Sequence, residues 1–176
     1  MQKAYVYKGA ELAAYGFGQT HPFGTDRHDV FHDALAALGL DEKVVMATPQ
    51  KAARQALALF HTDAYIEKVK AASVKGSGWL DGGDTPVFPG VFEAASVVAG
   101  TTMAAVDAIV EGQCQRAFVP IAGLHHAARD SAAGFCVFND CGIAIEYLLT
   151  ISIVQWQASS LRPSQCSIIQ HPGVTP

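Results

Sequence analysis

The feature that most constrains this chain is the order of its segments, in which short apolar strands alternate with loops and helices. The stretch "AYVY" at 4–7 predicts a short strand, and "RAFVPIAG" at 116–123 predicts a buried strand that opens into glycine. Helices are predicted over 27–38, 91–110 and 141–149. This alternation predicts an α/β fold with a parallel sheet, in which ligands bind beyond the carboxyl ends of the strands. A chain of 176 residues suits one domain.

Single residues mark the expected helix ends. Thr48 and Pro49 are typical of a helix start, with Thr48 as the cap and Pro49 in the first helical position. Thr62 and Asp63 predict a second start, for the "AYIEKVKAA" that follows. The apolar side of the helix at 27–38 should comprise Val30, Phe31, Ala34, Leu35 and Leu38, and that of the helix after Pro49 should comprise Ala52, Ala53, Ala56, Leu57 and Phe60.

The composition excludes several classes of protein. Half of the residues are hydrophobic and 16% are charged, which is typical of a globular chain and not of a disordered one. The formal net charge is −4, with 12 Lys and Arg against 16 acids, so nothing draws the chain to nucleic acid or to anionic membranes. The start lacks the apolar core of a signal peptide, and no run approaches 18 apolar residues, so we expect a cytoplasmic protein. The oligomeric state is left open.

The four cysteines show no metal-binding or disulfide pattern. Cys114, Cys136, Cys141 and Cys166 have no CxxC spacing, so they are most simply buried thiols in a reducing compartment.

Two adjacent histidines carry the clearest chemical signal. His125 and His126 follow the predicted strand at 116–123, where a tight loop could turn both imidazoles toward one pocket. Neighbouring side chains in an extended segment point apart, so the pair suits acid–base work on a water better than joint ligation of a metal. The alternative is that both are loop residues bound to backbone.

The stretch "GLHHAARDSAAGFCVFND" at 123–140 resembles the signature of the histone deacetylase superfamily, which includes bacterial acetoin-utilisation-type deacetylases and acetylpolyamine amidohydrolases. Supporting stretches follow the family order: "GQTHPFGTDRHDVFHDAL", "FHTDAYIEKV" and "GGDTPVFPGVFEAA". The resemblance spans residues 4 to 149, about the first half of a usual member. It implies an incomplete form of the three-layer, parallel-sheet arginase/deacetylase fold.

The resemblance also implies roles for particular residues. His126 matches the general base and His125 its electrostatic partner or acid. The remaining matches are Gly134 and Phe135 in the wall of an acyl-lysine tunnel, Cys136 beside the acetate, Asp84 as a rim acid that binds peptide N–H groups, and Arg27 at an inner channel.

Each of these residues also has an ordinary interpretation. Asp84 is a typical turn residue, Arg27 could pair with Asp26 or Asp29, and Phe135 could belong to the core. Cys136 could be an inert buried thiol or, as a sharper rival, the nucleophile of a metal-free hydrolase.

The family chemistry is zinc-assisted amide hydrolysis, and the ligands that the resemblance implies are missing here. They would come from an Asp-x-His and a later Asp, whereas no acid follows Glu146 and His171 stands alone near the end. The family's oxyanion tyrosine and the acids that orient its histidines are missing too. Zinc held by His125 and His126 alone would lack two ligands, so no metal site is assigned. Residues 1–150 are expected to form the N-terminal part of a deacetylase-like domain. Residues 151–176, whose single charge is Arg162, are expected to form a divergent tail.

The predicted function is therefore that of a zinc-dependent deacetylase of an N-acetyl amine, in a truncated or frame-shifted chain that is weakly active or inactive. An acetyl-lysine peptide or a small acetyl amine would be the substrate. The alternatives are a non-catalytic fold fragment or interaction protein, and a cysteine hydrolase that uses Cys136.

Overall fold

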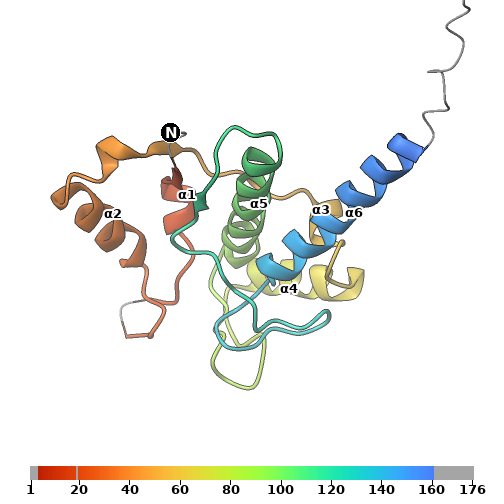
Figure 1. Ribbon diagram of the computed structural model, residues 1–176. Helices are drawn as coiled ribbons and strands as arrows, with labels where there is room; N and C mark the ends of the chain where they lie inside the picture. Colours follow the sequence, from red (N-terminus) through yellow and green to blue (C-terminus); the bar gives the residue numbers. More distant parts are fainter. Residues whose placement is uncertain (1–3, 19, 161–176) are drawn as a thin grey trace, which may run out of the picture.

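The computed structural model describes residues 4–18 and 20–160. Three short strands and six helices follow one another in the order shown in Figure 1. These are β1 (Tyr5–Tyr7), α1 (Ala10–Ala13), α2 (Arg27–Ala37), the 3-10 turn η1 (Asp41–Lys43), β2 (Val45–Ala47), α3 (Arg54–Leu57), α4 (Asp63–Lys75), α5 (Val91–Val110), β3 (Ala117–Phe118) and α6 (Asp140–Ser160).

The strands form one parallel sheet in the order β2-β1-β3. Val6 pairs with Met46 on one side and with Phe118 on the other, so these three side chains share a face. On that face the Phe118 ring lies 5.1 Å from the ring of Phe31 in α2. The opposite face carries Tyr7, which joins the main hydrophobic core around α5. The sheet therefore lies between helices, as the predicted α/β fold requires.

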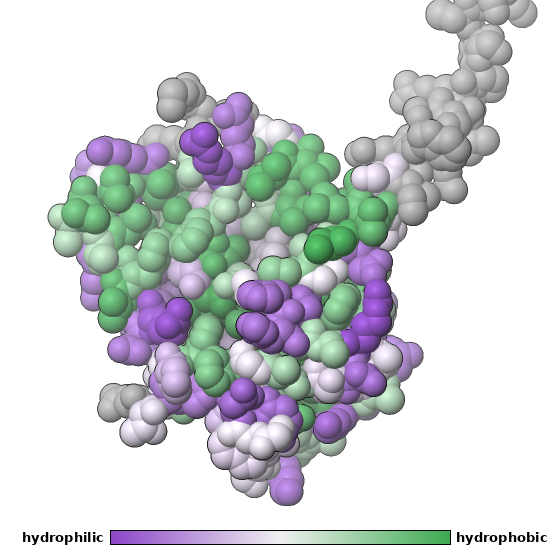
Figure 2. Space-filling view, turned by 60° about the horizontal axis from the view of Figure 1, so that its bottom comes forward, coloured by the Kyte–Doolittle hydropathy of each residue, from purple (hydrophilic) through white to green (hydrophobic). Residues whose placement is uncertain are grey.

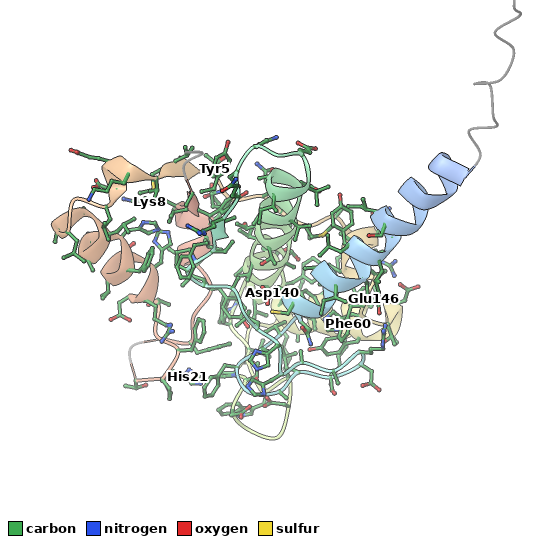
Figure 3. All side chains as sticks on the ribbon, in the orientation of Figure 1. Tyr5, Lys8, His21, Phe60, Asp140 and Glu146 are labelled. Carbon is green, nitrogen blue, oxygen red and sulfur yellow. The ribbon has the colours of Figure 1, made fainter. Side chains whose placement is uncertain are left out.

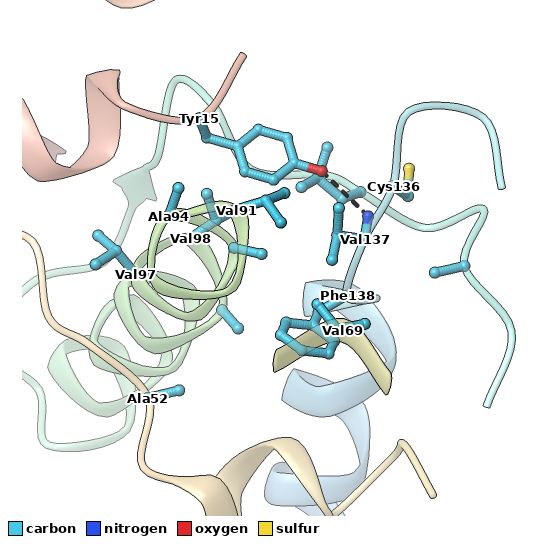
Figure 4. Close-up of a cluster of buried hydrophobic side chains, with 14 of the residues drawn as sticks. Tyr15, Ala52, Val69, Val91, Ala94, Val97, Val98, Cys136, Val137 and Phe138 are labelled. Atoms are coloured by element: carbon cyan, nitrogen blue, oxygen red, sulfur yellow. Dashed lines mark hydrogen bonds between the residues drawn. The ribbon is translucent and has the colours of Figure 1, made fainter. Parts of the chain in front are cut away.

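Helix α5 is the centre of the core. It contacts α1, α3, α4, α6 and β3, and Figure 1 shows it in the middle of the molecule. Its buried Val91 and Val98 pack among Tyr15, Val69 and Phe138 (Figure 4). Within the described ranges, α5 alone is long and apolar enough to span a membrane by length and composition, and its position explains that apolarity because a helix buried among others is apolar all round.

The predicted helix start at Thr48 and Pro49 is wrong. Residues 48–53 are not helical, and α3 begins only at Arg54. The Ala52 N–H instead donates to the Ser96 carbonyl of α5 at 2.9 Å, and a Cβ on Gly100 would overlap the backbone at 50–52. Close packing on α5 therefore overrides the local capping signal.

Two other predictions need correction. The expected apolar side of α2 is not its buried side: Val30 and Leu38 are exposed, whereas His28 and His32 are buried. These imidazoles bind backbone, since His28 Nε2 accepts from Gly9 N at 3.3 Å and His32 Nε2 donates to the Tyr7 carbonyl at 3.3 Å. The buried strand expected at 116–123 is only the two-residue β3, whose Phe118 is half exposed.

The other expected elements are confirmed. β1 lies within 4–7, α2 within 27–38, and α5 spans 91–110. Thr62 caps α4, since its Oγ1 accepts from Tyr65 N at 3.3 Å. Helix α6 covers 141–149 and continues to Ser160, whereas Arg162 and His171 lie outside the described residues.

Candidate active site

The histidine pair lies on the irregular segment 119–139, between β3 and α6. His125 and His126 are both exposed, and their ring centroids are 4.4 Å apart with planes tilted by 31°. The Nδ1 atom of His125 lies 2.9 Å from the Gly123 carbonyl. A carbonyl only accepts, so Nδ1 carries a hydrogen, and in the neutral ring Nε2 is then the atom without one. This arrangement gives one exposed imidazole a defined tautomer.

The next turn of the segment, 134–137, lies against the pair. Gly134 has a φ of 56°, which favours glycine, and a Cβ there would lie 3.0 Å from Cγ of His126, so a larger residue would be strained and would push this ring aside. Phe135 has a φ of 69°, the one positive value among the described residues that are not glycine. A phenylalanine in this conformation is strained, and such strain persists only where surrounding contacts impose it.

Those contacts come from two distant residues. The buried Tyr15 hydroxyl donates to the Phe135 carbonyl at 2.6 Å and accepts from Val137 N at 3.1 Å (Figure 4). Phe135 N donates to Thr85 Oγ1 at 3.2 Å. Burial raises the pKa of the Tyr15 phenol well above its usual value, so the hydroxyl stays protonated and keeps donating.

Other aromatic rings pack beside Phe135. The His21 ring meets the Phe135 ring edge-on at 4.6 Å and lies 4.8 Å from the ring of Phe17. His21 Nε2 donates to the Asp84 carbonyl at 3.2 Å, which ties three chain segments together. Figure 3 shows His21 at the end of the molecule where these loops gather.

Asp84 lies at the rim of a hollow of about 460 Å³, which is lined by residues 81–84 and 132–134. Hydrogen bonding with the Asp81 carboxylate raises the pKa of the Asp84 carboxyl. Asp81 itself accepts through one oxygen from the N–H groups of Gly83, Asp84 and Thr85 at 3.0–3.1 Å, as in an Asx turn. Asp84 is thus both a turn residue and an exposed acid on the hollow that Gly134 lines.

Cys136 and Arg27 lie apart from the exposed surface of the pair. The Cys136 side chain is buried and its Sγ lies 3.3 Å from the Gly134 carbonyl, while burial raises the pKa of the thiol. A thiol in this state is a poor nucleophile. The Arg27 guanidinium stacks on the Phe23 ring at 4.7 Å, and Asp29 pairs with His28. Among the predicted site residues, Gly134 thus lies against His126 and Asp84 lies on the hollow that Gly134 lines, whereas the Phe135 ring contacts His21 and Arg27 contacts Phe23.

Over residues 4–18 and 20–160, no three side chains among His, Cys, Asp and Glu are grouped so that they could hold a metal ion. Structural and catalytic zinc sites both need at least three protein ligands. These residues therefore do not fit a zinc ion.

Sequence reasoning missed several residues that hold the site. Tyr15 and His21 come from the first loop, and Asn139 and Asp140 end the quoted signature without an assigned role. Buried His61 also belongs here, because its Nε2 accepts from Asn139 N at 2.9 Å and its Nδ1 lies 3.2 Å from the Arg129 carbonyl. Asn and Asp are common at the start of a helix, so their position directly before the predicted helix at 141–149 is the one sequence signal that could have pointed to the last two.

The fold and the site define a class of protein, an incomplete α/β deacetylase-like fold with a tandem-histidine loop. The crystal structure of the HDA15 HD domain has this fold, with a TM-score of 0.77 at 21% identity over 86% of this chain and 44% of that one.

The chain belongs to the histone deacetylase family. The histone deacetylase domain matches residues 21–157. The acetoin utilization protein AcuC of Bacillus subtilis is 39% identical over 141 residues, which are 76% of this chain and 36% of AcuC. Histone deacetylase RPD3 of Saccharomyces cerevisiae is 34% identical over 157 residues, which are 83% of this chain and 35% of RPD3. The chain thus spans about a third of the length of these relatives.

Proposed function

We propose that this chain supplies the acid–base and acyl-binding part of a zinc-dependent deacetylase, which hydrolyses an N-acetyl amine such as an acetyl-lysine peptide. The observation that carries the proposal is the exposed His125–His126 pair packed against the Gly134–Phe135 turn. In this proposal the Phe135 ring supplies an apolar surface next to the proton-transfer groups, as hydrolysis of an amide on a long methylene chain requires.

Each residue has a part in this proposal. His126 takes the proton from the attacking water, while His125, which has taken up a proton from solvent on Nε2, stabilises the developing negative charge and gives that proton to the leaving amine. The proton held by His126 then passes to solvent, which restores both rings. Phe135 packs against the methylenes of the acyl-amine stem, and Gly134 leaves room for it. Asp84, exposed at the rim, accepts hydrogen bonds from the N–H groups of a bound peptide.

The groups that would bind zinc are not found among the described residues. Since no described cluster fits zinc, we propose that the chain on its own is weakly active or inactive. The remaining groups would have to come from polypeptide that corresponds to the other two-thirds of a relative such as AcuC.

A chimera tests the proposal. Residues 4–149 of this chain replace the matching segment of Bacillus subtilis AcuC, and turnover of a fluorogenic acetyl-lysine peptide is measured beside the chain alone with added zinc. We expect chelator-sensitive turnover from the chimera only, and a loss of about 100-fold or more in His126→Ala, as for removal of a general base. A folded chimera whose turnover does not depend on His126 would contradict the proposal.

The same chimera separates the rival functions. Cys136→Ser should leave turnover within about threefold, because a buried neutral thiol contributes little to chemistry. Loss of turnover in Cys136→Ser, together with resistance to chelators, would instead support a cysteine hydrolase. A folded chimera with no turnover at all would favour a non-catalytic fragment.

A further inference from the structure

Two neighbouring polar side chains join the histidine loop to the start of α6. Asn139 is 8% exposed and Asp140 is 1% exposed, and both direct their polar atoms at backbone of the segment 123–127. Burying such groups is costly unless every polar atom is bound, so their hydrogen bonds define what they hold in place.

Asp140 binds the backbone just before the pair. Its carboxylate accepts from Leu124 N at 2.6 Å, from Gly123 N at 3.0 Å and from the Thr102 hydroxyl at 2.7 Å. Gly123 has a φ of 99°, which glycine adopts without strain, and its carbonyl accepts from Nδ1 of His125. The carboxylate therefore fixes the peptide whose carbonyl sets the tautomer of His125.

Asn139 binds the backbone on both sides of His126. Its amide nitrogen donates to the His125 carbonyl at 3.1 Å and to the Ala127 carbonyl at 2.8 Å, and its oxygen accepts from Gly142 N at 2.7 Å. Both carbonyls are thereby tied to the first turn of α6, and the peptide units around His126 cannot rotate independently.

We propose that Asp140 and Asn139 are positioning residues for the tandem histidines. Asp140 acts through Gly123 to keep Nδ1 of His125 donating to the Gly123 carbonyl, which makes Nε2 the atom that takes up and gives the proton in the reaction. Asn139 sets the spacing of the two rings by holding the backbone around His126. The role in a reaction rests on the proposed function, whereas the effect on the tautomer does not.

The tautomer is measured on the chain itself from the ¹⁵N shifts of the His125 ring, at a pH where the imidazole is neutral. In Asp140→Asn one carboxylate oxygen becomes an NH₂ group that faces N–H donors, so the bonds to Gly123 N and Leu124 N cannot both survive and the backbone around Gly123 is loosened. We expect the hydrogen of His125 to move from Nδ1 to Nε2 in this variant. Retention on Nδ1 in folded Asp140→Asn would overturn the role of Asp140.

Two further variants make the result decisive. Thr102→Val removes the bond of Asp140 that does not reach the loop, so it should lower stability yet leave the hydrogen on Nδ1. If Asp140→Asn does not fold, Gly123→Ala decides: a Cβ there meets nothing within 4 Å, but alanine disfavours a φ of 99°, so the carbonyl should turn away and the hydrogen should move to Nε2. An unchanged tautomer in Gly123→Ala would then overturn the proposal.

Turnover of the AcuC chimera gives the second readout. Asn139→Ser and Asp140→Asn should each lower kcat by about 10-fold or more with KM within about twofold, because misplaced acid–base groups slow the chemistry without weakening binding. Unchanged kcat in both variants would contradict the positioning role. If the chimera shows no turnover that depends on His126, the proposed function fails, and the tautomer experiment still decides whether Asp140 holds the Nδ1 hydrogen of His125.

Discussion

At the scale of single residues, the site depends on buried side chains that bind backbone. Tyr15, His61, Asn139 and Asp140 each bond to main-chain atoms of the irregular segment 119–139 or of residues next to it. An irregular segment has no regular series of backbone hydrogen bonds. The bonds from these side chains therefore fix its shape in place of secondary structure. Substituting one of them should therefore affect the geometry of the site as well as the stability of the fold.

Tyr15→Phe tests this at the Phe135 turn. The change leaves the Phe135 carbonyl and the Val137 N–H without their partner in the core, and should lower the free energy of unfolding by about 2 kcal/mol in urea titration. Tyr65→Phe is the control, because its hydroxyl makes one such bond, to the Val137 carbonyl at 2.8 Å. Its loss should be about half as large. Equal losses would show that the two bonds of Tyr15 do not hold the turn.

The buried His61 should make the free energy of unfolding depend on pH. Burial lowers its pKa from 6.5 to about 4, and its Nε2 must stay unprotonated to accept from Asn139 N. Below pH 6.5 this histidine binds a proton in the unfolded chain but not in the folded chain. The free energy of unfolding is therefore highest above pH 6.5 and falls by up to about 3 kcal/mol as the pH drops to 4. Burial also lowers the pKa of His32, which adds to the fall in the same direction.

Urea titrations at pH 7, 5.5 and 4.5 measure this dependence. His61→Gln cannot titrate and should show a shallower slope between these pH values. An identical slope in the variant would assign the effect to other groups.

The candidate site could be predicted from the sequence only in part. His125, His126, Gly134 and Phe135 were found because they lie in one recognisable stretch, and Asp84 because its loop also matches the family. The residues that position them bind backbone atoms. Every residue has the same backbone atoms, so such contacts leave no pattern of paired side chains in the sequence. Arg27 was expected at an inner channel, a role that stays a prediction.

At the scale of elements, long helices were predictable and short ones were not. Helix α5 has 20 residues of nearly continuous apolar character, and α4 has a Thr62 cap, so local rules suffice for both. The Thr48–Pro49 signal failed because the segment after it packs on α5, where residue 100 has no side chain. That contact joins residues about 50 positions apart, which no local rule detects.

Gly100→Ala tests this packing. In an unconstrained helix interior the change would stabilise the protein by about 0.5–1 kcal/mol. Here the new methyl group would overlap the backbone at 50–52, so we expect a loss of about 2 kcal/mol in the free energy of unfolding. Gly82→Ala is the control, since a Cβ there meets nothing within 4 Å and its φ is not positive. A Gly100→Ala variant that is more stable than the parent would contradict the close contact.

At the scale of the whole molecule, much apolar surface is left uncovered. Figure 2 shows hydrophobic residues spread over the upper part of one face. Exposed large side chains include Val30 and Leu38 of α2, Phe118 of β3, and Leu149 of α6. In the described part of the chain β3 pairs only with β1, so its other edge also has free backbone groups. Apolar surface beside an unpaired edge favours association.

Phe118→Ser should therefore reduce self-association, measured as the rise of apparent mass with concentration in analytical ultracentrifugation. Phe118 is 51% exposed at this edge. Val74→Ser is the matched control, because Val74 is 87% exposed on α4, away from any strand. Equal effects of the two substitutions would show that association follows general hydrophobicity and not the edge of the sheet.

The strained Phe135 turn affects the order in which parts of the site fold. The hydrogen bond that fixes it joins Tyr15 to Phe135, which are separated by 120 positions. During synthesis the segment with the histidines therefore emerges long after Tyr15. The turn gains its shape only when that loop closes, late in folding. A nascent or partly unfolded chain therefore carries the two imidazoles before the turn beside them has formed.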